Sequence, residues 1–478
     1  MRKSLVAASV PVLVAGSAVL AQTNVDRFGR QLEQIQREQR VLVNSAIPAG
    51  QRAFFDYGGY LGFSFFAIDD VEQKMHVLDQ SDLVMYTRLN IDNVHEFFFR
   101  GRMSYRHFFT GGSFDGGGDE TTWPTVEQAY YRFDLARYLG AYASKPTQNN
   151  VVFQGGREFV CWANGLVLAQ TVDGATVELT AGNTSLLLLG GMTIDDTIDF
   201  DSSRPHFDDE TRRGMYGAML STQVGRHRPF IYGMIERDYN DNDPRTDYYT
   251  APPVVTRYDY NSYYIGLGSN GNIGDRIAYG VEFVYEWGQG LSSSVDELFG
   301  PVPQEDEDIS AYALDVRMDY LVGDAQRTKY TGEVILASGD DDRMNTSTTF
   351  GGNMRGTDDN AFNAWGLLNT GLAFAPVVSN IVSLRVGAST YPFSASSLKR
   401  LQVGSDVLFF AKFDMDAPID ERTFNERFLG VEPDLFLNWQ ITSDITLAMR
   451  YGLFFPGSAI KADENPRNFF YMGVTFAF

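Results

Sequence analysis

The chain has 478 residues, 44% hydrophobic and 14% aromatic, which is enough for one large barrel or for two to three soluble domains. Its formal net charge of -22 argues against a nucleic-acid partner. Its mean hydropathy of -0.21, with a single long apolar run at the extreme N-terminus, argues against a helical membrane protein.

The N-terminus reads as an export signal. Arg2 and Lys3 precede an apolar stretch that ends in small residues at Ala21, a pattern typical of a secretory signal peptide cleaved after that residue. An uncleaved anchor is the alternative. Cys161 is the sole cysteine, so a disulfide within the chain is excluded, and a core or interface thiol is expected.

Residues 22–52 are predicted to form a short periplasmic helical segment. Apolar positions within about 26–43 alternate spacings of four and three, at Phe28, Leu32, Ile35 and Leu42, with Gln39 interrupting the series. Barely two heptads are too few for a coiled coil. We expect a solvated amphipathic leader; weak association, or packing at a barrel mouth, is the alternative.

From Phe54 onward the hydrophobic period is two, which predicts an all-β fold over residues 53–478. Most candidate strands are near or above the roughly 9–11 residues that cross a bilayer when tilted. The predicted strands are 54–66, 80–92, 95–109, 125–137, 150–158, 174–181, 185–193, 211–224, 229–239, 258–270, 276–289, 309–322, 328–338, 363–375, 380–392, 428–440, 445–456 and 468–478. These 18 segments predict a transmembrane antiparallel β-barrel.

The connections between these strands alternate in length. Short ones such as 93–95 and 442–444 separate long ones such as 339–362 and 393–427. Outer-membrane barrels have short periplasmic turns and long external loops, and an even strand count places both ends of the barrel on the periplasmic side. The long loops are acidic, notably at Glu305–Asp308 and Gly339–Asp342. The carboxylates of these loops are suitable ligands for calcium. Solvated loops are the preferred interpretation, and no cofactor is expected.

Strand alternation separates an apolar face from a charged one. In 276–289, Ile277, Phe283 and Trp287 oppose Glu282 and Glu286. An arginine on the lipid face near the midplane costs roughly 2–4 kcal/mol, so the charged face is predicted to line a water-filled lumen. A β-sandwich is the alternative for any single strand, but eighteen such strands would be hard to pack into one soluble core.

The predicted pore-lining residues share this inward parity, and they can serve ion selectivity or brace the wall as charge ladders. For the row at 100, 102 and 106 we favour the pore. The set is Arg88, Arg100, Arg102, Arg106, Arg157, Arg317, Lys329, Arg385, Arg450, Glu282, Glu286, Asp315, Asp319 and Glu333.

The last strand has one apolar face, at Phe470, Met472, Val474, Phe476 and Phe478. A terminal strand that ends in phenylalanine resembles the assembly signal of bacterial outer-membrane barrels. That resemblance implies outer-membrane lipid and the barrel-assembly machinery as partners.

Several stretches resemble the bacterial alginate-export family, from about residue 126 to the end. They are Val126-Glu-Gln-Ala-Tyr-Tyr131, Gly155-Gly-Arg-Glu158 with Asn164-Gly165 and Asp173-Gly-Ala175, Glu333-Val-Ile-Leu-Ala-Ser-Gly-Asp-Asp341, Leu429-Gly-Val-Glu-Pro-Asp-Leu435 and Gly452-Leu-Phe-Phe-Pro-Gly457. The resemblance implies an 18-stranded barrel that exports an anionic polysaccharide through an arginine-rich constriction, and its motif contains Arg157. The sequence departs from the family at Cys161-Trp162 and in its acidic lumen positions, so the solute stays open.

The sequence therefore predicts a non-enzymatic channel in the bacterial outer membrane that passes anionic solutes, either anionic polysaccharide or sugar acids. Two alternatives stay open. One is a structural or adhesive barrel whose acidic loops bind a partner. The other is an outer-membrane hydrolase or protease, which would need a Ser-His-acid or a paired-Asp site at one rim. Of the five histidines, His107 is on the outer parity, His95 and His227 lie at short turns, and His76 and His206 are predicted in outer loops, where surface histidines are the preferred interpretation.

Overall fold

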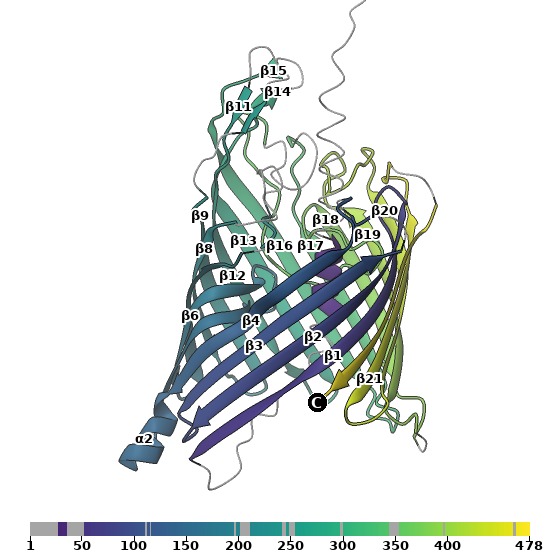
Figure 1. Cartoon of the computed structure of the whole chain (residues 1–478). Coiled ribbons are helices and arrows are strands. Elements are labelled where there is room, and N and C mark those ends of the chain that lie inside the picture. Colours follow the sequence, from purple (N-terminus) through teal and green to yellow (C-terminus); the bar gives the residue numbers. More distant parts are fainter. Residues whose placement is uncertain are drawn as a thin grey trace, which may run out of the picture.

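The protein is a closed antiparallel β-barrel of 18 strands (Figure 1). The computed structural model describes residues 27–35, 52–109, 112–114, 116–195, 197–200, 211–240, 245–247, 254–296, 300–343, 353–394, 397–461 and 465–478. Each barrel strand pairs with the next in the chain, and β22 (Arg467–Ala477) returns to pair with β1 (Ala53–Asp69), which closes the sheet. The predicted signal peptide lies outside the described residues.

Between those two strands the wall follows the chain. The other barrel strands are β2 Met75–Ile91, β3 His95–Phe108, β4 Glu120–Asp134, β5 Asn150–Cys161, β6 Ala169–Ala181, β7 Thr184–Thr193, β8 Arg213–Thr222, β9 His227–Asp238, β12 Tyr260–Ile273, β13 Ile277–Leu291, β16 Asp306–Leu321, β17 Lys329–Ala337, β18 Ile381–Thr390, β19 Leu401–Lys412, β20 Phe428–Gln440 and β21 Ile445–Pro456. Two short hairpins stand outside the wall, β10 Arg245–Asp247 with β11 Val254–Thr256, and β14 Val295–Asp296 with β15 Gly300–Pro301.

The two ends of the barrel differ as the loop lengths predict. The C-terminus and helix α2 (Leu135–Ala143) lie at the end with short turns, and both hairpins stand at the other end (Figure 1). We call these the turn end and the loop end. β4 stops at Asp134 because its carboxylate caps α2, accepting a hydrogen bond from the Arg137 backbone N–H, so the predicted strand 125–137 is too long. Among the described residues, no helix is long and apolar enough to cross a membrane.

The count of 18 strands is confirmed, but one predicted strand is wrong and one real strand is missing from the prediction. Segment 363–375 is not a strand, and β19 lies inside the predicted loop 393–427. Segment 363–375 looks strand-like because it packs inside the barrel, where Phe374 is fully buried. β19 was hidden because Gly404, Ser405 and Asp406 interrupt its apolar alternation.

Outward faces match the predicted parity. Phe97, Phe283, Leu384 and Phe476 are all exposed on the wall, as lipid-facing side chains would be.

The loop-end half of the lumen is a packed apolar core, which corrects the prediction of a wholly charged and water-filled interior. Phe66, Phe410 and Phe454 point inward from the wall and are buried. Phe374 stacks on Phe454 with ring centroids 4.2 Å apart, and Trp162 is fully buried. The sequence pattern misses this core because the partners of the inward apolar residues are loops that fold into the barrel.

The largest of these loops joins β17 to β18, and its residues 353–380 are here called the inner segment. Leu168 and Trp365 form a parallel β-bridge, which ties it to the β5–β6 connection. The Glu432 carboxylate of β20 accepts hydrogen bonds from the backbone N–H groups of Ala373 and Phe374, at 2.7 and 2.8 Å. These contacts hold the inner segment across the lumen.

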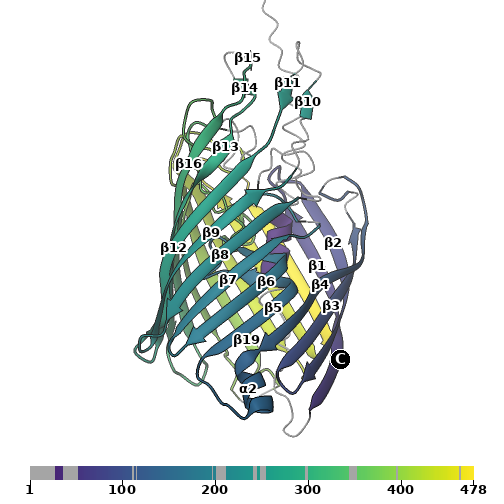
Figure 2. The same ribbon diagram turned by 90° about the vertical axis from the view of Figure 1, so that its left-hand side faces the viewer.

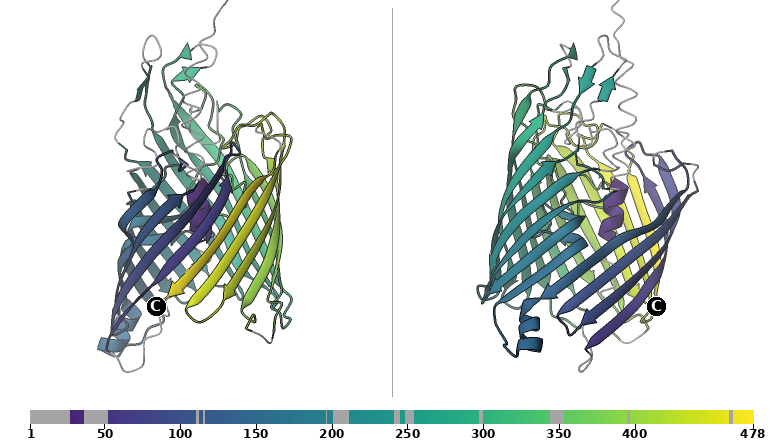
Figure 3. Two further views of the ribbon diagram at one scale, coloured as in Figure 1. Left: turned by 45° about the vertical axis from the view of Figure 1, so that its right-hand side comes forward. Right: turned by 60° about the vertical axis from the view of Figure 1, so that its left-hand side comes forward.

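Residues 27–35 form a helix inside the barrel, here called the lumen helix (Figures 2 and 3). Its Phe28 ring packs on Phe66 and Phe114, with centroids 5.4 and 5.2 Å away. Its Arg27 pairs with Asp420 and Glu421, each at 3.1 Å. The prediction of a periplasmic leader is therefore wrong for these residues.

The physical reason is that the apolar positions 28, 32 and 35 have a partner. They join the apolar core, while Gln31 donates a hydrogen bond to the Leu372 carbonyl of the inner segment. Gln39 and Leu42 of the predicted seam lie outside the described residues.

Candidate functional site: the lumen cavity

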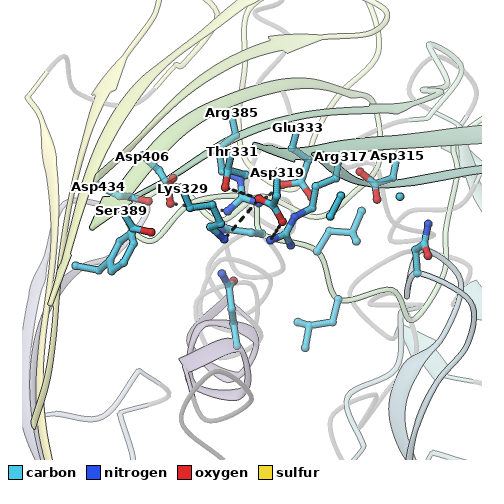
Figure 4. A pocket seen from close by; sticks show the side chains of 18 of the residues that line it. Asp315, Arg317, Asp319, Lys329, Thr331, Glu333, Arg385, Ser389, Asp406 and Asp434 are labelled. Atoms are coloured by element: carbon cyan, nitrogen blue, oxygen red, sulfur yellow. Dashed lines mark hydrogen bonds and ion pairs between the residues drawn. The ribbon is translucent and has the colours of Figure 1, made fainter. Parts of the chain in front are cut away.

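A cavity of about 770 Å³ lies in the turn-end half of the lumen. Most of its wall comes from strands β16 to β21, and Cys161, Asn164, Asn270 and residues 278–280 complete it. Figure 4 shows charged side chains of these strands converging on the cavity. Its roof comprises Leu367, Leu368 and Leu372 of the inner segment with Gln34 and Ile35 of the lumen helix. The cavity therefore lies between the packed core and the turn end.

Asp319 organises one part of the wall. Arg317 Nη2 lies 3.1 Å from its carboxylate, and Lys329 Nζ lies 3.5 Å from it. The Thr331 hydroxyl donates to the same carboxylate at 2.5 Å. Two cations on one carboxylate leave this patch with a local excess of positive charge.

Arg385 of β18 organises the next part. It lies 2.5 Å from Glu333 on β17 and 3.8 Å from Asp406 on β19. Asp315 and Asp434 line the same cavity on either side. A single buried guanidinium is therefore surrounded by several carboxylates.

Arg450 of β21 has a different setting. Its Nη1 donates to the Asn438 side-chain oxygen at 2.8 Å and to the Leu437 carbonyl at 3.3 Å. Its guanidinium lies 5.6 Å from the centroid of the Phe436 ring. On β19, the Gln402 side-chain amide donates a hydrogen bond to the Ser389 hydroxyl of β18. Amides and hydroxyls therefore complete the polar wall.

Seven predicted site residues meet in this cavity, from four strands. They are Arg317, Lys329, Arg385, Arg450, Asp315, Asp319 and Glu333. The prediction missed Asp406 because β19 was taken as a loop, and it missed Asp434 and Asn438 of β20. The parity of β20 could have identified these two, since Leu435 on the opposite face is exposed.

The row of Arg100, Arg102 and Arg106 faces inward but is fully engaged in ion pairs. Arg100 lies 2.6 Å from Glu127, and Arg102 lies 2.8 Å from Asp82. Arg106 lies 2.8 Å from Glu120 and covers the Phe28 ring of the lumen helix. Arg88 similarly pairs with Asp56 at 3.0 Å. These contacts favour the bracing role over the pore role that we preferred from the sequence.

Replacing the three arginines of this row together by serine is expected to shift permeability toward cations, because their three carboxylate partners would keep their charge. The reversal potential in a salt gradient across a planar bilayer measures the shift. Adding D82N, E120Q and E127Q to the triple variant should return the reversal potential toward the wild-type value. An unshifted potential in the triple variant would mean that the row does not face the conducting water.

Glu282 and Glu286 face inward as predicted, but they hold loops and do not line the cavity. Glu282 accepts from the Asn164 backbone N–H at 2.9 Å, and Glu286 accepts from the Asn363 backbone N–H at 2.9 Å. Tyr232 also donates to Glu282 at 2.6 Å. Both glutamates are fully buried beneath the segments that they anchor.

Arg157 was placed in the lumen by the family motif, and the structure corrects this. It pairs with Asp173 across two hydrogen bonds of 2.7 Å, and Asp173 lies opposite Met192, whose side chain is exposed on the outer wall. Residues directly opposite one another share a face, so Arg157 belongs to the outward face. The motif identifies the residue but not its direction.

The four described histidines are held in local contacts. His76 lies in β2, not in a loop, and its Nε2 lies 3.1 Å from Asp70, while Nδ1 has no hydrogen-bond partner. His95 and His227 each contact a tyrosine hydroxyl at 2.8 Å, and His107 contacts Asp119 at 2.9 Å. His206 lies outside the described residues.

One acidic loop keeps its carboxylates together. Asp340, Asp341 and Asp342 can bring one oxygen each to within 4.8 Å of one another. Burial, followed by the charge of Asp359, raises the pKa of Asp340 to about 7, and Arg343 opposes this. A raised carboxylate pKa disfavours the charged form at neutral pH. Calcium binding there stays a prediction.

Cys161 offers a direct probe of the cavity, because it lines the cavity and its side chain is exposed. Modification by a negatively charged thiosulfonate reagent is expected to reduce the single-channel current, since it adds bulk and charge to the wall. The current should be recorded before and after the reagent is added. Cys161→Ser is the matched control and should be insensitive; an unchanged wild-type current would contradict the placement of the cavity on the conducting path.

A family model described as alginate export matches residues 170–473, more than half of the chain. No curated sequence relative matches. The fold is similar to three solved structures from Pseudomonas aeruginosa. OccK8 (OprE) has a TM-score of 0.53 at 10% identity, covering 89% of this chain and 98% of that one. OccK2 (OpdF) in complex with glucuronate has 0.51 at 9%, covering 89% and 98%. OpdK with vanillate has 0.50 at 9%, covering 88% and 98%.

The family match and the closed barrel agree with the resemblance that the motifs carry. The protein therefore belongs to the alginate export family and is a β-barrel channel of the bacterial outer membrane.

Proposed function

We propose that this channel passes small organic acids of sugar-acid size by passive diffusion, without catalysis. The observation that carries the proposal is the lumen cavity, whose volume of about 770 Å³ is within the range of sites for small molecules. Its four cations alternate with carboxylates, amides and hydroxyls along neighbouring strands.

This alternation suits a sugar acid. The carboxylate of the solute would bind Lys329 or Arg317, where two cations share Asp319. Solute hydroxyls would bond to acceptors such as Asp406 and Asn438, and an apolar ring face would lie on Phe436. Such a wall offers exchangeable contacts that are favourable enough for entry and weak enough for release.

A long polysaccharide is the less favoured solute. The apolar core, the inner segment and the lumen helix fill the described loop-end half of the lumen, so a polymer would require both segments to move. The solved structures of OccK2 with glucuronate and OpdK with vanillate contain small acids, which agrees with this choice.

We also propose that the barrel-assembly machinery inserts this chain, which its aromatic C-terminal strand supports. That strand closes the wall against β1 and exposes Phe476 and Phe478 on the outside.

The channel function is tested with purified protein in planar bilayers. Reversal potentials in a potassium chloride gradient, and then with glucuronate replacing chloride, should show that both anions permeate and that glucuronate lowers the chloride current. A channel that conducts potassium but neither carries glucuronate nor is blocked by it would overturn the proposal. Passage of alginate oligomers with no effect of glucuronate would favour polymer export instead.

A further inference from the structure

The barrel wall is not closed along its whole height. β4 pairs with β5 only from Asp134 to Ala129, where Ala129 lies opposite Arg157. On its other side β4 stays paired with β3 as far as Glu120. Among the described residues, which include all of 116–195, residues 120–128 of β4 are therefore an edge within the wall. Figures 2 and 3 show the strands diverging toward the loop end, with the lumen helix visible between them.

The sequence at this seam explains why pairing stops. Gly156 has a φ of +135°, and a Cβ there would lie 2.1 Å from the Ala129 carbonyl oxygen. Pro124 lacks a backbone N–H, which fits an unpaired edge and not a central strand. The β3–β4 register also shifts twice, between Arg100 and Gly101 and between Arg102 and Ser104, and such irregularities bend a strand away from its neighbour.

Polar groups gather where the wall opens. Arg157 Nη1 donates to the Val126 carbonyl at 3.2 Å, which satisfies one acceptor of the β4 edge. Arg157 and Asp173 form an ion pair on the outward face. Charged side chains are unfavourable in contact with lipid, so this ion pair indicates a polar environment at the seam. A row of backbone N–H and C=O groups cannot face hydrocarbon without partners, so the edge must be in contact with water or a polar ligand.

The seam borders the lumen. Cys161 ends β5 beside the seam, is exposed, and also lines the lumen cavity. The chain then turns into the barrel, since Trp162 is fully buried. β5 therefore does not continue along the wall beyond Cys161, because the chain enters the core at Trp162.

An apolar groove on the outer surface of the wall begins at the turn-end limit of the seam. Its volume is about 330 Å³, and it reaches Ala129 and Gly155 next to the last β4–β5 pairs. The remaining lining is largely apolar, from Phe55, Leu89, Phe97, Phe98, Phe99, Tyr130 and Tyr131, with Thr87. A single apolar chain fits such a groove, and its polar head would then lie at Arg157.

We propose that the seam between β4 and β5 is a water-filled lateral opening that binds single-chain amphiphiles and connects the lumen with the membrane. The polar head lies at the β4 edge beside Arg157, and the apolar chain lies in the aromatic groove. This function is separate from the passage of small acids along the lumen, and either one can fail without the other.

The opening is tested first with engineered disulfides. If pairing continued beyond Ala129, residue 125 would lie opposite Cys161, or residue 124 after a one-residue register shift. P124C and T125C, each with native Cys161, should therefore form no disulfide on oxidation, because an open seam keeps the sulfurs too far apart. The matched control is A129C/R157C in a C161S background, which joins the last pair and should oxidise readily.

Heat-modifiable migration on gels confirms that each variant is folded. Disulfide formation by P124C or T125C to the extent of the control would show a closed wall and overturn the proposal. Rapid hydrogen exchange of the amides at 120–128 in nanodiscs, against slow exchange in β2, is the second expected result; equal protection would also overturn it.

The ligand class is tested with a diazirine analogue of dodecanoate in proteoliposomes. Photolabelling should concentrate on residues 120–128 and on the groove, and excess dodecanoate should suppress it while excess glucuronate should not. R157Q should lower this labelling several-fold, whereas R52Q, at an exposed arginine outside the seam, should leave it unchanged. Labelling spread evenly around the lipid-facing wall would overturn the assignment of the seam as the binding site.

Discussion

Replacing Arg27 by glutamate is expected to raise the single-channel conductance several-fold. Arg27 is buried between Asp420 and Glu421, so the variant would bring three carboxylates together in a site that excludes water. Loss of one partner from a buried ion pair costs about 3–5 kcal/mol, and about 1.4 kcal/mol corresponds to a tenfold change in an equilibrium. The ratio of seated to released lumen helix should therefore fall by roughly two orders of magnitude or more.

Release of the lumen helix would widen the channel because this helix fills the loop-end lumen together with the inner segment. Single-channel recording at fixed voltage measures the change, and the charge-swapped pair R27D/D420R should recover part of the original conductance. R52E is the matched control, since Arg52 pairs with Asp92 at 3.1 Å on the outside of the lumen. Equal conductance of R27E and the wild type, with both proteins folded, would show that the helix does not obstruct the current.

Replacing Arg385 by glutamine is expected to make the channel markedly more selective for cations. Arg385 is the guanidinium between Glu333 and Asp406, and Asp315 and Asp434 line the same cavity. Its removal leaves a cluster of carboxylates facing the conducting water, which attracts cations and repels chloride and glucuronate. The reversal potential in a potassium chloride gradient should move toward the potassium equilibrium potential.

Arg385→Lys separates charge from geometry. It keeps the positive charge but loses the planar fork, so we expect selectivity near that of the wild type with weaker block by glucuronate. Arg385→Gln is also expected to lower stability, because Glu333 and Asp406 lose the cation with which they pair. An unchanged reversal potential in Arg385→Gln would contradict the placement of the selectivity element in this cavity.

The parts of the structure that repeat locally were predictable. Alternation gave the outward face correctly at positions such as Phe97, Phe283, Leu384 and Phe476, because a lipid-facing row is mostly apolar whatever its neighbours are; Arg157 of β5 is the exception. The same parity placed Arg317, Arg385 and Arg450 in the lumen. The spacing of the predicted strands also gave the alternation of short and long connections, except at 393–427, which contains β19.

The parts that depend on distant contacts were not predictable. Whether an inward arginine lines water or braces the wall is decided by its neighbour on the next strand, as Glu127 decides for Arg100. Segment 363–375 resembled a strand because alternation does not distinguish lipid from a protein interior as the apolar surroundings. β19 resembled a loop because Gly404, Ser405 and Asp406 interrupt its alternation, and only its pairing with β18 and β20 shows it to be a strand.

By itself the sequence determined that this protein is an outer-membrane barrel with a mostly apolar outer face and charged positions on the inner one, because period-two alternation and bilayer thickness are local constraints. Only the tertiary structure decided what occupies the lumen. The lumen helix and the inner segment lie there because residues hundreds of positions apart, such as Arg27 and Asp420, meet in space. The break between β4 and β5 is of the same kind, since it depends on which strand edge finds a partner.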